Sequence, residues 1–460
     1  MNVRGMCYNL RLALSGRDRQ QSLLENLQQA EKAPISEITR VQEELLRKLL
    51  RHAFFNVPYY RRILDGLGGL EYLESHKPTV VLRKMPLLTK DIIRENFNDL
   101  KSNDLSGRRW YYNSSGGSTG EPIKLIQDQD CLISSSALKM LFDNWTGYSV
   151  GMPKIVLWGS ERDLFGGRIP IKNRVGRCLR NERWLNSFRM TECDMRDYVQ
   201  IINNFRPVQI LAYVEAIYQI ARFIEQEGLD VYSPKAIMTS AGTLYPQMRE
   251  VIEEVFQAPV FNRYGSREVS DIACECEAHK GLHVSPLTHY VEIITKDGTP
   301  AALGEVGEVI VTWLVNYAMP LIRYRIGDLA RWESAECSCN RHWPLLKEVT
   351  GRVTDAFLRA DGGVVMPEYF IHMLGVVVNA PWIRKFQVVQ EKYDLIRLLV
   401  VPSDTHAAIE GIDKSKDTLE QIVRVAMGNE CSLEIEIVDE IPSSPSGKYR
   451  YTISKVQRHV

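Results

Sequence analysis

Glycines and hydroxyl side chains gather in one segment of the 460-residue chain, Tyr112-Asn113-Ser114-Ser115-Gly116-Gly117-Ser118-Thr119-Gly120-Glu121-Pro122. Glycines let backbone N–H groups approach an anion closely, and hydroxyls add further donors, which is what a polyphosphate requires. The segment is not a Walker A loop, because Gly-Lys does not follow at the required spacing. It predicts a phosphate-binding loop, with a plain Ser/Gly-rich connector as the alternative.

Metal-ligand residue types form a second group. Cys274-Glu275-Cys276 is followed by His279 and His283, and Cys337-Ser338-Cys339 by His342. Three cysteines with one histidine make a closed structural zinc set, in which no coordination position stays open for chemistry. We expect Zn²⁺ to be bound by four of these residues, Cys276, His283, Cys337 and Cys339. The alternative is reduced thiols packed in the core beside a hairpin.

Four further motifs carry polar side chains at turns. They are Asn262-Arg263-Tyr264-Gly265-Ser266-Arg267-Glu268, Tyr324-Arg325-Ile326-Gly327-Asp328, Gly351-Arg352-Val353-Thr354-Asp355 and Pro442-Ser443-Ser444-Pro445-Ser446-Gly447-Lys448. Taken singly, each has an ordinary structural interpretation as a packed tyrosine, a solvated aspartate or a surface lysine. Their order along the chain is more informative than any one of them.

The elements that must position these residues alternate in the middle of the chain. Residues 208–213, 235–239 and 259–263 have the pattern of buried strands, and residues 214–227 and 245–256 that of helices. This β-α-β-α-β order predicts a doubly wound parallel sheet, in which ligands bind beyond the carboxyl ends of the strands. Two such ends are the loops Ser240-Ala241-Gly242-Thr243 and Tyr264 to Glu268.

The rest of the chain predicts two further regions. Residues 270–350 are rich in strands, including 290–295, 308–312 and 321–325. From residue 354 onward, a hairpin over 356–366, strands over 383–389, 395–401 and 433–438, and a helix over 416–427 indicate a small α+β domain. We therefore expect an α/β protein with a large domain over residues 1–353, including the strand-rich part, and a small C-terminal domain over 354–460.

Composition excludes several classes of protein. The chain has 57 basic and 57 acidic residues and thus no formal net charge, which argues against a protein dominated by nucleic-acid binding. No apolar run reaches the roughly 18 residues that a membrane span needs. The first residues lack the apolar core of a signal peptide, so we expect a cytoplasmic protein.

In their order, these motifs resemble those of the adenylate-forming superfamily of acyl-CoA synthetases, luciferases and peptide-synthetase adenylation domains. The resemblance is strongest to the phenylacetate–CoA ligases and their CapK-type relatives. It rests on Leu49-Leu50-Arg51-His52-Ala53, Val57-Pro58-Tyr59-Tyr60-Arg61, Pro86-Leu87-Leu88-Thr89-Lys90 and Phe386-Gln387-Val388-Val389-Gln390. The resemblance covers nearly the whole chain.

This resemblance implies an ATP site. Residues Ser115, Gly116, Gly117, Ser118, Thr119 and Gly120 would hold the phosphates that leave as pyrophosphate. Tyr264 would stack on adenine with Asn262 at its amino edge, and the neighbouring Ser240, Ala241, Gly242, Gly265 and Ser266 would line the nucleotide site. Asp328 would bind the ribose hydroxyls, assisted by Arg352. Gly116 stands where the superfamily commonly has a hydroxyl residue.

The resemblance also implies catalytic roles. Glu268 would ligate Mg²⁺, which neutralises charge between two approaching anions. Lys448 would bridge the attacking carboxylate and the α-phosphoryl oxygens. The small domain would act as a mobile lid that turns about a hinge at Asp355 between two half-reactions.

The function implied is ATP-dependent activation of a carboxylic acid, followed by acyl transfer to CoA. The stretch Phe357-Leu358-Arg359-Ala360-Asp361-Gly362-Gly363 lacks the Arg-Gly-x-Asn-Val-type run of the phenylacetate enzymes, which weakens the case for CoA. A CapK-type transfer to an amine of a sugar or amino acid is the alternative. An alternative of another class is a catalytically silent scaffold stabilised by zinc.

Two other features have open interpretations. Residues 159–189 contain seven arginines, which favour either an anionic acceptor, a solvated surface or a contact with a second copy of the chain in a homodimer. Trp158, Tyr213 and Tyr245 fall near strand ends, where they would line an acyl pocket or simply pack in the core.

Overall fold

The computed structural model describes residues 2–14, 19–114, 123–158, 171–187, 190–333, 336–352, 357–360, 364–365, 369–370, 374, 382–403, 405–442 and 449–456. The chain divides into two compact units. The first comprises Met1–Leu244, Met248–Ile326 and Ala330–Val349, and the second comprises Tyr245–Gln247, Gly327–Leu329 and Thr350–Val460.

The first unit begins with helices and a hairpin. The helices are α1 (Val3–Leu14), α2 (Arg19–Ala30), α3 (Ile35–Asn56), α4 (Pro58–Gly66), α5 (Gly69–Ser75), α6 (Pro78–Lys84), α7 (Lys90–Glu95) and the short 3-10 helix η1 (Leu105–Gly107). Strands β1 (Trp110–Ser114) and β2 (Lys124–Asp128) form an antiparallel pair. The proline at position 58 separates α3 from α4, because it ends one helix and occupies the first turn of the next.

A large sheet follows, with the strand order β10-β11-β12-β13-β9-β8-β7-β6-β5-β3-β4. Its strands are β3 (Lys154–Leu157), β4 (Glu182–Leu185), β5 (Gln209–Tyr213), β6 (Ala236–Ser240), β7 (Val260–Ser266), β8 (Ser270–Glu275), β9 (Leu282–Val284), β10 (His289–Ile294), β11 (Gly307–Trp313), β12 (Tyr324–Trp332) and β13 (Leu345–Arg352). Strands β4, β3, β5, β6 and β7 pair in parallel, whereas β7, β8 and β9 pair antiparallel.

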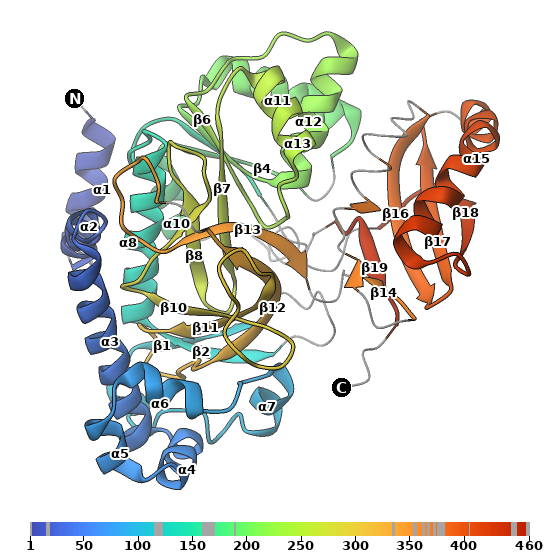
Figure 1. The fold of residues 1–460 in the computed structure, drawn as a ribbon. Helices are drawn as coiled ribbons and strands as arrows, with labels where there is room; N and C mark the ends of the chain where they lie inside the picture. Colours follow the sequence, from blue (N-terminus) through green and yellow to red (C-terminus); the bar gives the residue numbers. More distant parts are fainter. Residues whose placement is uncertain are drawn as a thin grey trace. The chain divides into compact units, whose positions relative to one another are not determined.

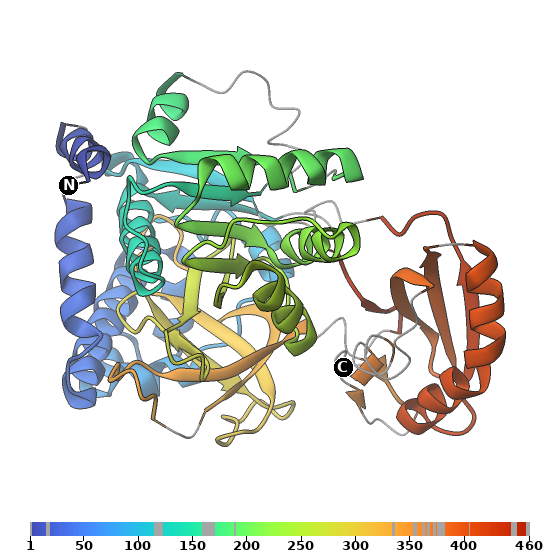
Figure 2. The same ribbon diagram turned by 90° about the horizontal axis from the view of Figure 1, so that it is seen from above.

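Helices cover both faces of the parallel part, as Figures 1 and 2 show. Ile210 and Ile237 pack in one cluster with α11 (Glu192–Phe205), α12 (Val214–Glu227) and α13 (Pro246–Phe256). The next residues along the same strands, Leu211 and Met238, pack with α8 (Gln129–Trp145). Successive side chains of a strand point to opposite faces. The predicted α/β doubly wound architecture is therefore confirmed.

The helices begin and end where local chemistry predicts. The side chain of Thr191 accepts from the backbone N–H of Asp194, whose carboxylate accepts from Thr191 in return, so α11 begins with a capping box. Helix α12 ends at Gly228, which has a φ of 61° in the left-handed region. The expected strand over 321–325 begins later, at Tyr324, because Arg323 has a φ of 52° that interrupts extended backbone.

The second unit contains a sheet in the order β18-β17-β16-β19. Its elements are β14 (Phe357–Leu358), β15 (Val364–Val365), β16 (Ile383–Lys392), β17 (Leu395–Pro402), α15 (Thr405–Met427), β18 (Ser432–Ile437) and β19 (Thr452–Ser454). The two central strands are antiparallel, and each has a parallel partner on its other edge. Leu419, Ile422 and Val423 of α15 pack with Val388 and Leu398 of the sheet. None of the described helices is both long and apolar enough to cross a bilayer.

A buried histidine makes the stability of the first unit depend on pH. The side chain of His289 hydrogen-bonds through Nε2 to the carbonyl of Val269 at 2.8 Å, and Thr288 Oγ1 lies 2.9 Å from its Nδ1. Burial lowers the pKa of His289 to about 4, although the bond to Val269 acts in the opposite direction. The unfolded chain takes up this proton below its ordinary pKa of about 6.5.

We therefore expect the stabilisation by neutral His289 to be complete above pH 6.5 and to be lost as the pH falls towards 4. The free-energy difference between the wild type and His289→Gln should shrink over that window by about 1.4 kcal/mol per pH unit. Urea unfolding at a series of pH values measures this difference. A gap that stays constant from pH 7 to pH 4.5 would contradict the assignment.

Candidate functional site

The predicted nucleotide residues of the first unit lie at the ends of two adjacent parallel strands. Ser240 ends β6, and the register that pairs Thr239 with Asn262 places β7 beside it. Ala241 follows with a φ of 62°, an uncommon conformation for a residue with a side chain. Such backbone conformations persist where the surrounding structure imposes them and are frequent at functional sites.

Close packing between two strands explains why position 265 of the Tyr264-Gly265-Ser266 motif is a glycine. A Cβ built on Gly265 would lie 2.5 Å from the carbonyl oxygen of Ser270, so only glycine fits between β7 and β8. The ladder between the two strands is irregular between Tyr264 and Gly265. The pairing resumes at Gly265 and Ser266, which face Asp271 and Ser270, and the turn that carries Glu268 connects the two strands.

Glu268 lies in that turn and is 8% exposed. The turn is held by two amide side chains of the β1–β2 hairpin. Gln127 donates from Nε2 to the carbonyls of Arg267 at 3.3 Å and of Glu268 at 3.1 Å, and Asn113 donates to the same Arg267 carbonyl at 3.0 Å. Asn113 also donates to Gln127 Oε1 at 3.0 Å. The hairpin that flanks the predicted phosphate loop is therefore bonded directly to the backbone of the predicted magnesium ligand.

The remaining predicted residues are distributed as follows. Asp328 lies on β12 within the second unit, and the backbone of Arg352 ends β13. The phosphate loop over residues 115–120, the hinge at Asp355 and Lys448 lie outside the described residues. Trp158 and Tyr213 pack together with ring centroids 4.1 Å apart at the ends of β3 and β5.

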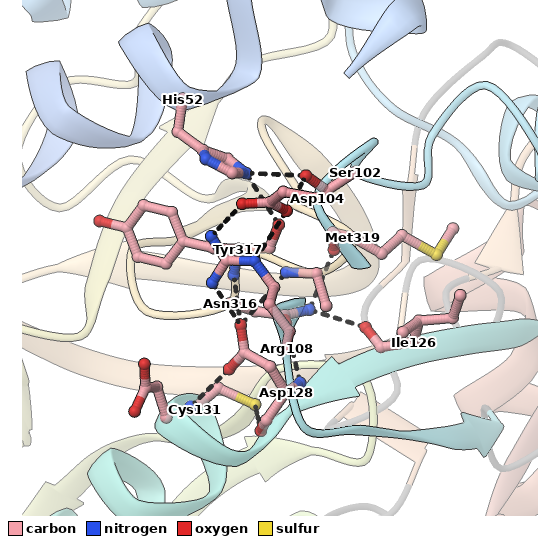
Figure 3. Close-up of polar contacts among 12 residues, drawn as sticks. His52, Ser102, Asp104, Arg108, Ile126, Asp128, Cys131, Asn316, Tyr317 and Met319 are labelled. Atoms are coloured by element: carbon pink, nitrogen blue, oxygen red, sulfur yellow. Dashed lines mark hydrogen bonds and ion pairs between the residues drawn. The ribbon is translucent and has the colours of Figure 1, made fainter. Parts of the chain in front are cut away.

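A buried polar network anchors the base of the hairpin (Figure 3). Asp128 ends β2 and caps α8, where its Oδ1 accepts from Cys131 N at 2.8 Å. Its Oδ2 accepts from the backbone N–H groups of Tyr317 at 3.1 Å and Ala318 at 3.2 Å. Arg108, 3.6 Å from that oxygen, also donates twice to Asp104, at 2.8 and 2.7 Å. These bonds to Arg108 lower the pKa of Asp104 to about 2.

Two residues of the N-terminal motifs hold the same turn from the other side. His52 Nε2 lies 2.9 Å from the carbonyl of Tyr317 and 3.2 Å from Ser102 Oγ, and burial lowers the pKa of this histidine. Tyr60 donates to the carbonyl of Pro320 and accepts from Ile322 N. Both motif residues therefore fix the segment from Tyr317 to Ile322, which leads into β12.

The four predicted zinc ligands lie together. One ligand atom from each of Cys276, His283, Cys337 and Cys339 falls within 4.8 Å of all the others. Cys276 Sγ and Cys337 Sγ are 3.5 Å apart, and Cys339 Sγ is 3.3 Å from His283 Nε2. Two sulfurs bound tetrahedrally to one Zn²⁺ would lie roughly 3.8 Å apart, because each bond is about 2.3 Å.

The histidine of this cluster has its nitrogens arranged for a metal. His283 Nδ1 is 3.3 Å from the carbonyl of Trp343, which can only accept, so Nδ1 carries the proton and the neutral ring leaves Nε2 free. Burial lowers the pKa of His283 to about 4, which keeps the ring neutral. The other two histidines of the group are engaged elsewhere, since His279 bonds Glu275 and His342 Nδ1 bonds the carbonyl of Ala33.

Comparison with known proteins shows which domain and which fold this chain resembles. A family model described as the CapK C-terminal domain matches residues 357–455. The fold matches 2-hydroxyisobutyryl-CoA ligase in its postadenylation state in complex with R3-HIB-AMP, with a TM-score of 0.72 and 17% identity, covering 93% of this chain and 91% of that one. An amide bond synthetase, McbA from Marinactinospora thermotolerans, matches with a TM-score of 0.51 and 18% identity over 73% of this chain and 66% of that one. The chain thus has the fold of the adenylate-forming ligases.

Two curated relatives are similar to this chain over most of its length. Protein CapK of Staphylococcus aureus is 26% identical over 434 residues, which cover 92% of this chain and 90% of CapK. Phenylacetate–coenzyme A ligase of Escherichia coli K12 is 28% identical over 320 residues, covering 65% of this chain and 68% of that enzyme. The predicted resemblance to CapK and to the phenylacetate–CoA ligases is confirmed by these similarities.

Local sequence patterns do not reveal the residues that hold the candidate site in place. Gln127, Asn113 and Asp128 act on partners 140 to 190 positions away, so no local spacing reveals them. For Asp128, the one available signal is its position directly before a helical pattern, which is typical of an N-cap.

We expect Asp128→Asn to destabilise the chain by about 3 kcal/mol, because it removes a buried charge that compensates Arg108. Asparagine still caps a helix. The loss of stability therefore measures the contribution of the charge and of its backbone hydrogen bonds, not that of the helix cap. The matched control is Asp130→Asn, which breaks only an exposed pair with Arg19 and should cost less than about 1 kcal/mol. Equal unfolding midpoints in urea for the two variants would refute this account.

Proposed function

We propose that this chain is an ATP-dependent ligase that activates a carboxylic acid as an acyl-adenylate and then transfers the acyl group. A carboxylate oxygen attacks the α-phosphorus of ATP, and the bond to pyrophosphate breaks. A second nucleophile then attacks the acyl carbonyl, loses its proton, and AMP leaves. The observation that supports this best is the similarity along 93% of the chain to a ligase that holds an acid–AMP adduct.

The roles proposed for the residues follow the superfamily motifs. Tyr264 and Asn262 bind adenine at the end of β7, and Asp328 binds the ribose with help from Arg352. Residues 115–120 bind the leaving phosphates. Glu268 holds Mg²⁺, which neutralises charge as the two anions approach. The contacts from Gln127 to the carbonyls of residues 267–268 tie the backbone that carries Glu268 to the β1–β2 hairpin, which supports this role.

CoA is the first candidate acceptor, since several relatives are phenylacetate–CoA ligases and one solved neighbour is a ligase in complex with 2-HIB-AMP and CoA. An amine is the second candidate. It is favoured by the CapK-type C-terminal domain and by coverage, because CapK matches 92% of the chain and the phenylacetate enzymes 65–72%. The two acceptors are distinguished by testing a panel of carboxylic acids with ATP and Mg²⁺. The panel is repeated with CoA, with amines or with neither.

The activating step is tested at Lys448. We expect Lys448→Ala to lower carboxylate-dependent pyrophosphate release by about 10²–10³, because it removes stabilisation of charge that develops in the transition state. The control is Lys455→Ala, a half-exposed lysine of the same unit that pairs with Glu391. Its rate should stay at the wild-type level, and both melting curves should be unchanged. A wild-type rate for Lys448→Ala would rule out the lysine's role, and pyrophosphate release by no acid in the panel would favour the silent scaffold.

We further propose that Cys276, His283, Cys337 and Cys339 hold one structural Zn²⁺. When bound, the ion supplies a four-coordinate cross-link between the end of β8, β9 and the segment before β13. The described donor set supports this, since three thiols and one unprotonated imidazole nitrogen lie at near-tetrahedral separations.

Zinc is tested by metal analysis. The purified protein should contain about one Zn²⁺ per chain. Cys337→Ser should lose the metal and melt at a lower temperature, whereas Cys193→Ser, at an exposed cysteine of α11, should retain both the metal and the melting temperature. A zinc-free protein with an unchanged melting curve after chelation would show that these thiols are ordinary core residues.

A further inference from the structure

Two buried glutamines of the motif Phe386-Gln387-Val388-Val389-Gln390 bond the backbone of other segments in the second unit. Gln387 is 7% exposed, and Gln390 is fully buried. A buried amide side chain needs hydrogen-bond partners, because leaving it unpaired is costly. Both glutamines lie on β16, the central strand that pairs with β17 on one edge and with β19 on the other. The partners of their amides therefore show which parts of the unit this motif joins.

The first glutamine holds the segment that directly follows Lys448. Gln387 donates from Nε2 to the carbonyl of Arg450 at 2.7 Å, and the hydroxyl of Tyr449 donates to the carbonyl of Phe386. The regular pairing of β19 with β16 begins two positions after Arg450. These two side-chain bonds therefore extend the attachment of the chain to β16 from the end of β19 towards the lysine.

The second glutamine joins a third strand to the same place. Gln390 Nε2 donates to the carbonyl of Leu358 at 2.6 Å, and its Oε1 accepts from the backbone N–H of Leu358 at 2.9 Å, as a backbone partner would. The same Oε1 accepts from Ser454 Oγ at 2.8 Å. Leu358 lies on β14, which begins two positions after the predicted hinge at Asp355, and Ser454 lies on β19 (Figure 1). One amide thus connects the strand after the hinge to the strand after the lysine.

We propose that Gln387 and Gln390 are positioning residues for Lys448. The inference rests on the proposed function, in which the small domain turns about Asp355 and Lys448 stabilises the transition state. Such a lid delivers its lysine to a fixed position only if the strand after the hinge and the strand after the lysine move as one body. The two amides join these strands through β16. Displacement of a reacting group by about 1 Å can cost about 10²-fold in rate, so losing either amide slows the step that depends on Lys448.

Gln387→Met tests the proposal, because methionine has a similar length but no amide donor. We expect kcat for carboxylate-dependent pyrophosphate release to fall by about 10- to 100-fold. The KM for ATP should not change, since the residues proposed to bind the nucleotide are intact and only a transition-state interaction is lost. The matched control is Gln421→Ala, at an exposed glutamine of α15 in the same unit, which should leave both constants at the wild-type value.

A double-mutant cycle separates positioning from a general structural role. Because Gln387 acts through Lys448, Gln387→Met should cause no further loss of rate in a chain that already carries Lys448→Ala. A loss of folded protein would instead lower both rates by the same factor and would appear in the melting curves. Tyr449→Phe removes only the hydroxyl that bonds Phe386 and should lower kcat in the same way, so it provides a second test if Gln387→Met does not fold.

Hydrogen exchange tests Gln390 without any activity measurement. In Gln390→Met, the backbone N–H of Leu358 loses its acceptor and should exchange about tenfold faster, whereas Gln421→Ala should leave this exchange unchanged. Unchanged exchange in Gln390→Met would overturn the proposal. So would wild-type kcat in folded Gln387→Met and Tyr449→Phe, or losses that multiply with that of Lys448→Ala. A wild-type rate for Lys448→Ala alone would instead refute the proposed role of the lysine, and this inference with it.

Discussion

The carboxylate of Glu275 is the interaction on which the rest of the candidate site depends. It is buried at the end of β8 and accepts two hydrogen bonds from Arg249 of α13, at 2.7 and 2.8 Å, and one from the backbone of Asn262 at 3.0 Å. Burial alone would raise the pKa of Glu275, but bonds from His279, Arg249 and Asn262 outweigh it and lower the pKa. A buried charge of this kind requires all of its partners, so it fixes a helix and two strands relative to one another.

That carboxylate also links the two clusters of functional residues in the first unit. Glu275 stands directly before Cys276, one of the four proposed zinc ligands, and bonds the strand that two positions later carries Tyr264. A cross-link that fixes Cys276 therefore also fixes the strand beneath the proposed adenine site. The proposed metal ligands and the proposed adenine site are thus joined by one short path of covalent and hydrogen bonds.

Much of this arrangement can be predicted from sequence because it is local or depends on residue type. The parallel strands and their helices follow from apolar periodicity, and the grouping of three cysteines with His283 follows from the residue types that metals prefer. Elements set by distant contacts are harder to predict. Helix α15 begins at Thr405, eleven residues before the expected start, and includes Gly411, whose missing side chain makes room for the ring of Trp382. Likewise, nothing near Gln127 in the sequence indicates that it bonds the turn around Glu268.

Helix α1 illustrates a limit of the rule that apolar patterns identify the buried face. Its docking depends on Gly5 and Asn2, which allow a close backbone approach and a hydrogen bond, and on few apolar side chains, with Leu12 the buried one. A helix can therefore be oriented by steric fit and polar bonds while its hydrophobic stripe remains uncovered. In such a case the apolar periodicity still has physical meaning, because leaving that area in water is unfavourable. Here the periodicity describes an exposed surface rather than the buried face of the helix.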